Sequence, residues 1–323
     1  MRCERAYEGE NKALFKVSLV PVLCRFASYP CIRFYSRQVE LDDLCVAAGW
    51  REGAVAIVFR QQEPLPFSVG DQLALAASEE RYCVGWRSPE SGKASPCPDQ
   101  ATTKGASQCE ACLRREVIIP CHRCTGERCG NPVRREKCIQ PDNHEIYLAF
   151  FRPGLIKVGV ARCERIVDRV AEQSARAAVS IGQADGKEIR NMEYHCRRIG
   201  YVDRVSLSTK LDAWAVPAQR EAMYVELERA AGEIRSRLHG SWYKQAHRIE
   251  VGDFPALVKR PRQLVHMSGL RLRGRIEGVY GNLMVVLSDS GDNVAFESAS
   301  LVGYRLRQLA ADEVGQGQMA LAI

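Results

Sequence analysis

The spacing of six cysteines between residues 109 and 138 constrains the fold of this chain more than any other feature of its sequence. They form two Cys-x2-Cys pairs followed by two single cysteines: Cys109, Cys112, Cys121, Cys124, Cys129 and Cys138. A Cys-x2-Cys turn brings two sulfur atoms to one side of a tight loop, where both can bind one tetrahedral Zn²⁺ at about 2.3 Å. The spacing therefore predicts a zinc ribbon.

The division of these cysteines between zinc sites is open in the sequence. The simplest site takes the two Cys-x2-Cys pairs as its four ligands. Cys129 and Cys138, with His144 or His122, could instead complete a second site or replace members of the first. Because a closed four-ligand site leaves no position for a substrate, we expect the zinc to be structural.

The remaining cysteines, from a total of 14, are scattered along the chain. We interpret Cys83 and others like it as small buried apolar side chains. Cys97 could be a further zinc ligand, but we interpret it as a loop thiol. Disulfides need an oxidising compartment, and the polar residues 1–12 lack the apolar core of a signal peptide. The sequence also has no run of about 18 apolar residues. We therefore expect a cytoplasmic protein that does not cross a membrane.

The composition, with 46% hydrophobic and 26% charged residues, is typical of a globular protein and excludes a disordered, collagenous or coiled-coil chain. Runs rich in Val, Ile and Phe, such as 13–26 and 53–60, predict β-strands. We expect an α+β fold with a β-rich N-terminal domain (1–95), a zinc-binding segment (96–143), an α/β module (144–252) and a small C-terminal β domain (253–323). The C-terminal strands could form a small barrel or extend the N-terminal sheet.

The α/β module has the clearest pattern of secondary structure. Two β-rich runs, 145–151 and 155–161, are joined by Arg152-Pro153-Gly154, which predicts a hairpin. The next segment has helical spacing, with one apolar face: Ile166, Val167, Val170 and Ala171. The elements expected after it are a strand at 177–183, a helix ending at Gly200 and a long helix beginning near Pro217.

The hairpin and the helix after it resemble the core of the GIY-YIG nuclease superfamily. That superfamily has a Gly-Ile-Tyr-like and a Tyr-Ile-Gly-like triplet on two strands, an Arg on the next helix and a Glu on a later one. The corresponding residues here are Glu145-Ile146-Tyr147, Lys157-Val158-Gly159, Arg169 and Glu193. The resemblance implies a GIY-YIG-like α/β fold for the module.

A closer resemblance is to a family of uncharacterised bacterial and archaeal proteins that place a cysteine-rich zinc segment directly before such a hairpin. Its pattern runs H-x-V-Y-L-A, then K-V-G-V-T-R, then R-x-x-E-Q-G-A. The matching stretches begin at His144, Lys157 and Arg169, and Ser174 stands where that family has Gly. The match extends over about residues 109–215.

The superfamily resemblance implies a phosphodiesterase site, in which tyrosines position or deprotonate a water, an Arg stabilises the phosphate charge and a Glu holds one divalent metal ion. The candidate catalytic residues are Tyr147, Lys157, Arg169 and Glu193, with Mg²⁺ or Mn²⁺ at Glu193. Lys157 replaces the second tyrosine. An ordinary lysine, with a pKa of about 10.4, is a poor base unless burial lowers that value.

Residues around these positions are candidates for substrate binding: Gly159, Arg162, Arg165 and Gln173. The net charge of +7 permits a polyanionic partner without requiring one. The alternating Arg271, Arg273 and Arg275 should share one face of a strand, which could lie along a phosphate backbone. Solubility alone would also explain these charges. Similarly, Arg165 and Arg169 could belong to a solvated ion-paired helix face with Asp168 and Glu172.

Three functions are compatible with these patterns. The first is a zinc-stabilised protein that interacts with nucleic acid and cleaves it as a metal-dependent phosphodiesterase of the GIY-YIG type. The second is a zinc-containing nucleic-acid-binding or regulatory protein without catalysis, which the substitution by Lys157 favours. The third is a small-molecule enzyme of specialised metabolism that uses the same pocket for a substrate bearing phosphate or carboxylate.

Overall fold

The computed structural model describes residues 43–51, 54–60, 64–88, 93–116, 121, 124–238, 240, 242–251, 260–261, 263–310, 313 and 321–322. In these residues the chain is a mixed α+β protein built on mostly antiparallel sheets, as expected. The apolar run at 13–26 lies outside the described residues. No helix in the described part of the chain is both long enough and apolar enough to cross a membrane.

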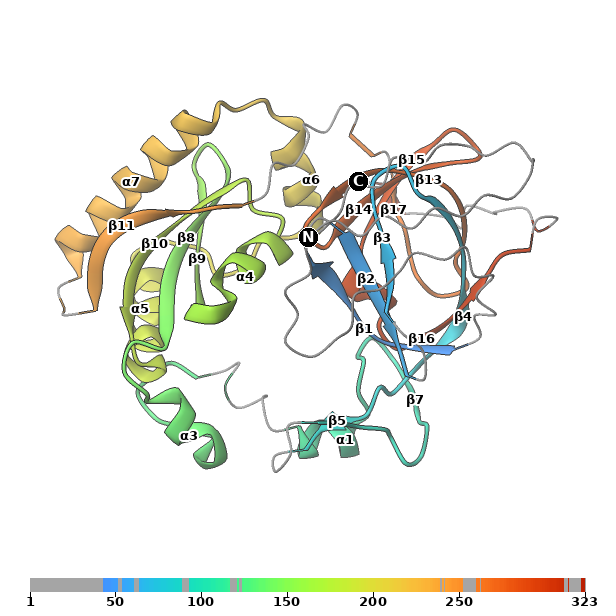
Figure 1. Ribbon diagram of the computed structural model, residues 1–323, viewed down its shortest axis with the longest axis horizontal. Helices are drawn as coiled ribbons and strands as arrows, with labels where there is room; N and C mark the ends of the chain where they lie inside the picture. Colours follow the sequence, from blue (N-terminus) through green and yellow to red (C-terminus); the bar gives the residue numbers. More distant parts are fainter. Residues whose placement is uncertain are drawn as a thin grey trace, which may run out of the picture. The chain divides into compact units, whose positions relative to one another are not determined.

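A sheet of eleven strands takes its members from both ends of the described chain (Figure 1). The strands are β1 (Asp43–Arg51), β2 (Ala54–Phe59), β3 (Leu65–Phe67), β4 (Gln72–Tyr82), β7 (Thr102–Thr103), β12 (Gln263–Leu264), β13 (Arg271–Tyr280), β14 (Leu283–Ser288), β15 (Asn293–Glu297), β16 (Tyr304–Gln308) and β17 (Leu321–Ala322). Their order is β17-β12-β15-β14-β13-β4-β16-β1-β2-β3, and β7 pairs with β4. Because β4 lies between β13 and β16, the C-terminal strands extend the N-terminal sheet, one of the two arrangements expected.

Alternation of buried and partly buried residues explains these strands. In β2, Val55, Ile57 and Phe59 are buried and the residues between them are only partly buried. In β4, Leu73 and Leu75 are likewise buried. A period of two with one apolar face is the pattern of a strand that packs on a core through that face.

The cysteine-rich segment contains little regular structure. The strands β5 (Trp86–Arg87) and β6 (Ala94–Ser95) form a separate two-stranded sheet, and two short helices follow, α1 (Glu110–Arg115) and α3 (Pro132–Cys138). Asn131 caps α3, because its side chain accepts a hydrogen bond from the Arg134 N–H at 3.3 Å. Proline occupies the first position of α3. The N–H of any other residue at this position would have no partner within the helix, so nothing is lost by the absence of an N–H in proline.

The α/β module forms a four-stranded antiparallel sheet in the order β11-β10-β8-β9. Its elements are β8 (His144–Arg152), β9 (Leu155–Arg162), a 3₁₀ turn (Cys163–Arg165), α4 (Ile166–Glu172), β10 (Ala177–Ala184), α5 (Gly186–Arg198), α7 (Arg220–Arg237) and β11 (Tyr243–Ile249). The predicted hairpin is confirmed, with Gly154 in its turn at φ +74°. The predicted end of α5 is also confirmed, since Gly200 follows it at φ +111°.

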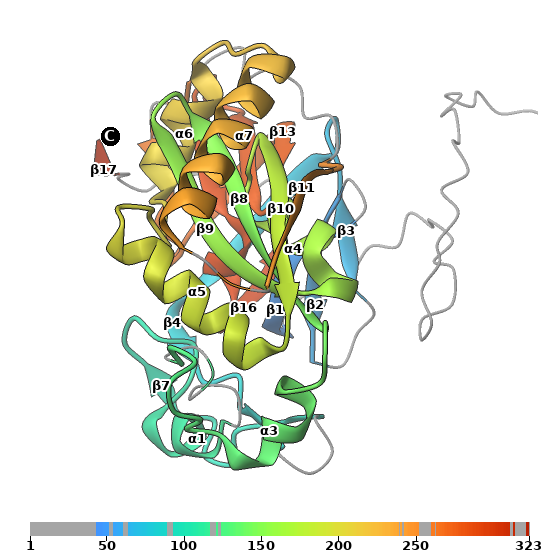
Figure 2. The same cartoon turned by 90° about the vertical axis from the view of Figure 1, so that its left-hand side faces the viewer.

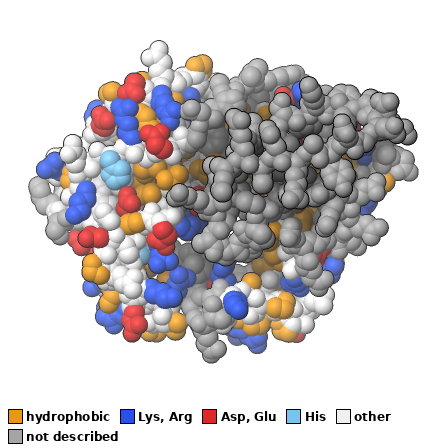
Figure 3. Space-filling model, viewed as in Figure 1, with side chains coloured by type: hydrophobic (Ala, Val, Ile, Leu, Met, Phe, Trp, Pro, Cys, Tyr) orange, Lys and Arg blue, Asp and Glu red, His pale blue; other side chains and the backbone are white. Residues whose placement is uncertain are grey.

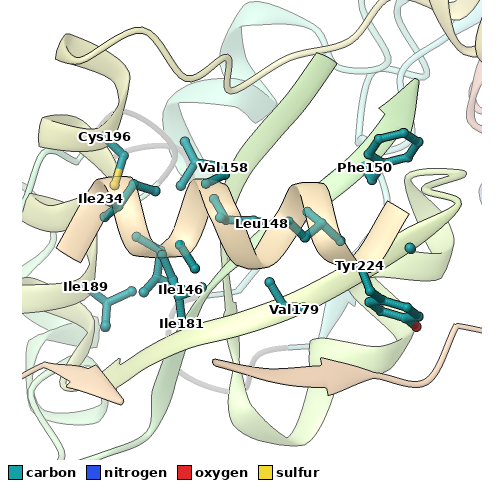
Figure 4. Close-up of a cluster of buried hydrophobic side chains, with 14 of the residues drawn as sticks. Ile146, Leu148, Phe150, Val158, Val179, Ile181, Ile189, Cys196, Tyr224 and Ile234 are labelled. Atoms are coloured by element: carbon teal, nitrogen blue, oxygen red, sulfur yellow. The ribbon is translucent and has the colours of Figure 1, made fainter. Parts of the chain in front are cut away.

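One face of this sheet forms the core of the module with α5 and α7 (Figure 2). Ile146 and Leu148 of β8 and Val179 of β10 pack with Ile189 of α5 and Ile234 of α7, as Figure 4 shows. All five side chains are at most 1% exposed. The sheet is therefore closed on this side by apolar contacts, and a polar site must lie on its other side or at its edge.

The helix α4 presents Ile166, Val170 and Ala171 to the interior, as the spacing predicts. The fourth residue of the predicted face, Val167, is 47% exposed, and that part of the prediction is wrong. The helix is only seven residues long and begins after a 3₁₀ turn. Its apolar face is therefore narrower than the apolar face of a longer regular helix, and Val167 lies outside it.

The helix α6 (Leu207–Ala215) packs on the large sheet and is absent from the sequence prediction. Leu211 and Trp214 contact Tyr280 and Leu283, which flank the turn between β13 and β14. The Arg176 guanidinium donates to the carbonyl oxygens of Ala213 (2.7 Å) and Val216 (2.6 Å). It thus satisfies carbonyl groups that the end of α6 would otherwise leave unpaired.

Candidate functional site

Four thiols from three segments of the chain meet in one cluster. Cys83 follows β4, Cys97 follows β6, Cys109 precedes α1 and Cys112 lies within α1. Their sulfur atoms all lie within 4.8 Å of one another. Cys83, Cys97 and Cys112 are buried, and all four are free thiols.

Backbone N–H groups point at the sulfur of Cys83. The Gly85 N–H donates to it at 3.4 Å and the Cys109 N–H donates to it at 3.2 Å. Gly85 has φ +93°, and a Cβ at this position would overlap the carbonyl oxygen of Ser95. Donors of this kind orient a thiolate and stabilise its charge, as they do around metal-bound sulfur.

The pKa values of Cys83, Cys97 and Cys112 are shifted in different directions. Burial raises the pKa of Cys83 and of Cys112, whose neighbours within the cluster raise it further. Burial also raises the pKa of Cys97, but hydrogen bonds from the backbone at Ala101 and Asp99 and from the other thiols outweigh it and lower the pKa to about 7. The cluster therefore contains a thiol that ionises near neutral pH, and thiolate is the form that binds a metal.

The cluster could hold a metal ion, and its chemistry fits structural zinc. Four sulfur ligands complete a tetrahedral site and leave no open position. The apolar core around it is small, with only Trp86 and Ala101 packing against the cysteines in the described part of the chain. A metal would supply the cross-links that so small a core does not.

The ligand set differs from the simplest one that the sequence suggests. The structure groups Cys109 and Cys112 with Cys83 and Cys97, and not with the pair Cys121 and Cys124. Our interpretation of Cys83 as an apolar side chain and of Cys97 as a loop thiol is corrected accordingly. Cys97 had been considered only as an alternative ligand and Cys83 not at all, because β4 and β6 bring these residues to α1 from positions too far along the chain for spacing to reveal.

A second group of polar side chains lies on the hairpin and on α4. Tyr147 of β8 faces Gly159 of β9 in the antiparallel register. A Cβ on Gly159 would overlap the Tyr147 hydroxyl, so the ring occupies the space above the glycine. Tyr147 is 1% exposed, and burial raises the pKa of its hydroxyl.

Gln173, at the end of α4, connects Tyr147 to Lys157. Its side-chain Nε2 donates to the Tyr147 hydroxyl oxygen and, at 2.9 Å, to the carbonyl oxygen of Arg169. Its Oε1 accepts a hydrogen bond from Lys157 Nζ. The amide is thereby fixed in orientation by one donor and two acceptors, and it holds two of the candidate catalytic side chains together.

Lys157 lies in an environment that lowers its pKa, which is the condition under which a lysine could act as a base. Burial, and after it the positive charges of Arg169 and Lys210, lower its pKa to about 8, while Glu193 opposes them. Near pH 8 a substantial fraction of this amine is therefore neutral. Arg169 and Glu193 also act on the pKa of Tyr147, so the four candidate catalytic residues lie within electrostatic range of one another.

Two of the charged candidates, Glu193 and Arg169, have ion-pair partners. Glu193 accepts from Arg190 on the same helix, with Oε2 to Nη1 at 2.9 Å. Arg169 lies 3.4 Å from Glu172 and its side chain is 50% exposed. Lys210, which the sequence did not indicate, lies on α6 and is paired with Glu297 at 2.5 Å.

The candidate substrate-binding residues divide into two groups. Gly159 and Gln173 belong to the site around Tyr147, as described above. Arg165 instead pairs with Glu172 at 2.6 Å, and Arg162 pairs with Glu164 at 3.1 Å. The exposed side of α4 is thus an ion-paired face, the alternative that its charge pattern suggested.

The predicted row of arginines on β13 is also paired with acidic groups. Arg271 lies 2.6 Å from Glu313, and Arg275 lies 2.7 Å from Glu277. On the face in Figure 3, the described Lys and Arg side chains are interspersed with Asp and Glu. The row shares one side of the strand as expected, but its charge is largely compensated.

The fold and the cluster define an α+β protein with a four-cysteine site that could hold zinc. The chain belongs to the DUF2797 family, described as protein of unknown function, which matches residues 70–306. No curated protein and no solved structure matches the chain. The match includes both the cysteine cluster and the site around Gln173.

Proposed function

We propose that this is a zinc-stabilised protein that binds nucleic acid, and that the site around Gln173 contacts a backbone phosphate. The observation that carries the proposal is the convergence of Lys157, Arg169 and Lys210, whose positive charges act together at the buried amine of Lys157. Glu172 pairs with Arg169 and Glu297 with Lys210, but Lys157 has no ion pair among the described residues and donates to the neutral Gln173. Burying a positive charge is unfavourable without an anion nearby. A phosphate would compensate these charges and accept hydrogen bonds from Lys157 and Arg169.

The topology supports the comparison with GIY-YIG nucleases. A β-hairpin is followed by a short helix, a third strand that pairs with the first strand of the hairpin, and a second helix. Tyr147, Arg169 and Glu193 occupy the first strand and the two helices in the order that the resemblance requires. This correspondence supports a phosphodiester as the group that the site recognises.

A specific observation also favours hydrolysis as a second candidate function. Lys157, with a pKa of about 8, can accept a proton from water, whereas burial raises the pKa of Tyr147 and makes its phenolate hard to form. In the step that we propose, water oxygen attacks phosphorus, its proton passes to Lys157 Nζ, and the ester oxygen leaves with a proton from solvent. A divalent cation at Glu193 would stabilise the developing charge, after displacing Arg190 from this carboxylate.

Binding is tested by fluorescence anisotropy with labelled single-stranded and double-stranded DNA and RNA over a range of salt concentrations. We expect Lys157→Met to weaken binding and to reduce the slope of log K against log salt by about one phosphate contact. Lys244→Met, which removes an exposed lysine from β11, is the matched control and should change neither quantity. Absence of binding to all four probes at low salt would refute the proposal and point to a small anionic substrate.

Hydrolysis is tested with the same nucleic acids, Mg²⁺ or Mn²⁺, and EDTA as the negative control. We expect cleavage that rises with pH through about 8 and is lost in Lys157→Met and in Glu193→Gln. Arg190→Gln should lower the metal concentration needed for half-maximal activity, because it frees the Glu193 carboxylate. Tight binding of nucleic acid with no cleavage product under any of these conditions would refute hydrolysis and support a nucleic-acid-binding function without catalysis.

A further inference from the structure

A second set of four cysteines lies between α1 and β8, outside the cluster described above. These residues are Cys121, Cys124, Cys129 and Cys138, and all are free thiols. Only Cys129 is exposed, and the other three are partly buried. They belong to neither the first cluster nor the site around Gln173.

The turn at Cys124 repeats the turn at Cys83. In Cys124-Thr125-Gly126 the Gly126 N–H donates to Cys124 Sγ at 3.4 Å, the same distance as from Gly85 to Cys83. Gly126 has φ +83° and Gly85 has φ +93°. The two Cys-x-Gly turns therefore share a backbone conformation that directs an N–H at sulfur, the arrangement found in the cluster that could hold zinc.

Cys121 also receives a hydrogen bond from a buried group. Asn131 is 6% exposed, and its Nδ2 donates to Cys121 Sγ at 3.2 Å while its Oδ1 caps α3. The amide thus places the sulfur of Cys121 at the start of α3, whose last residue is Cys138. A donor that is held in place by a helix cap fixes the position of the sulfur that it contacts.

Cys138 and the turn at Cys124 both lie against the start of α5. A Cβ on Gly186 would overlap Cys138 Sγ, so the glycine provides the space for this sulfur. A Cβ on Gly126, in the Cys124 turn, would likewise overlap the carbonyl oxygen of Lys187, so this turn and Cys138 pack on the same end of α5. Cys129 joins the set through Asn131, because its Sγ donates to the Asn131 carbonyl oxygen at 3.3 Å while the Asn131 side chain donates to Cys121.

We infer that Cys121, Cys124, Cys129 and Cys138 bind a second structural Zn²⁺, separate from the one assigned to the first cluster. Four thiolates satisfy the tetrahedral coordination that zinc prefers. Of the histidines considered from the sequence, His144 lies against Gly186, as Cys138 does, with its Nδ1 2.5 Å from Asn143 Oδ1, and His122 lies outside the described residues. The inference is independent of the proposed binding of nucleic acid.

The two sites differ in how closely their ligands are arranged. In the described part of the chain, only the first cluster has all its ligand atoms within 4.8 Å. The thiols of the second site must therefore draw together around the metal, and the irregular segment between Cys124 and α3 can adjust for this. Because this adjustment opposes binding, the second zinc should be released first when a chelator is added.

Metal content of the full-length protein tests the inference directly. We expect two zinc ions per chain in the wild type and one in the double variant Cys124→Ser/Cys138→Ser. The control Cys163→Ser should retain two, because Cys163 lies outside both clusters and its hydrogen bond to the Asp142 carbonyl can be made by serine. One zinc in the wild type, or two in the double variant, would overturn the second site.

A measurement on the wild type alone covers the case in which the double variant does not fold. Cys129 is exposed, so as a free thiol it should react rapidly with iodoacetamide. As a zinc ligand it should be protected in the zinc-loaded protein and become reactive together with the other three after a mild chelator is added. Rapid alkylation of Cys129 in protein that retains all its zinc would contradict the inference.

Discussion

Tyr147 on β8 faces Gly159 on β9, and the ring of the tyrosine fills the space that a side chain at position 159 would take. This pair fixes the hydroxyl of Tyr147 next to Gln173, which in turn holds Lys157. The position of the polar site therefore depends on a residue that has no side chain. Substitutions of Gly159, Gln173 and Lys157 should show how much this arrangement contributes to the stability of the protein.

Gly159→Ala should destabilise the protein, because the new Cβ overlaps the Tyr147 hydroxyl within a buried sheet. We expect a loss of about 1–3 kcal/mol in the free energy of unfolding, the usual range for overpacking a core. Urea unfolding followed by circular dichroism measures this change. Gly232→Ala is the matched control, since Gly232 is exposed on α7 and a Cβ there would meet no atom within 4 Å. It should be neutral or stabilising by about 0.5–1 kcal/mol.

Gln173→Leu should cost roughly 2–4 kcal/mol of unfolding free energy, because it leaves the Tyr147 hydroxyl and Lys157 Nζ without their buried partner. Gln173→Glu retains an oxygen that accepts from Lys157 and gives a second one to which the Tyr147 hydroxyl can turn its own proton, while the Arg169 carbonyl loses its donor, so this variant should recover part of the loss. Thermal unfolding of both variants at neutral pH measures the difference. Equal stability of the two would show that the amide does not join the two side chains in solution.

Lys157 should make the stability of the protein depend on alkaline pH. Its pKa is about 8 in the folded state and 10.5 when unperturbed, so between these values the unfolded state binds more protons and stability rises with pH. Below about pH 8 the folded protein bears the full cost of the buried charge, on the order of 3 kcal/mol. Lys157→Met should remove this part of the slope, as measured by urea unfolding at several pH values. Lys244→Met should leave the slope unchanged, and a wild-type slope that persists in Lys157→Met would assign it to other groups.

Local patterns account for what the sequence predicted correctly. Arg152-Pro153-Gly154 determines the hairpin through its own turn preference, and Gly200 ends α5 because it tolerates positive φ. Both features depend on residues close in the chain. The relation between Tyr147, Lys157 and Gln173 was partly visible in the same way, since the hairpin register and the next helix bring them together.

Long-range packing accounts for what the sequence did not show. The helix α6 and its Lys210 were missed, because Leu211 and Trp214 find their partners on β13 and β14, far along the chain. Cys83 was missed for the same reason, although its Cys-x-Gly turn, repeated at Cys124, was a signal that could have been used. Ion pairs such as that of Glu193 with Arg190 depend on rotamers that spacing does not determine.

Ser174→Gly should stabilise the protein. Ser174 follows α4 with φ +63°, a conformation that costs a non-glycine residue roughly 1–2 kcal/mol. Its hydroxyl is buried and has no hydrogen-bond partner among the described residues, which adds to the cost. Glycine removes both penalties but gains entropy in the unfolded chain, so we expect a net increase of about 1 kcal/mol. Thermal unfolding would measure this, and Ser174→Ala serves as the comparison. Alanine removes the hydroxyl and keeps the strain, so it should stabilise less than glycine, and the opposite order would show that the backbone strain is absent.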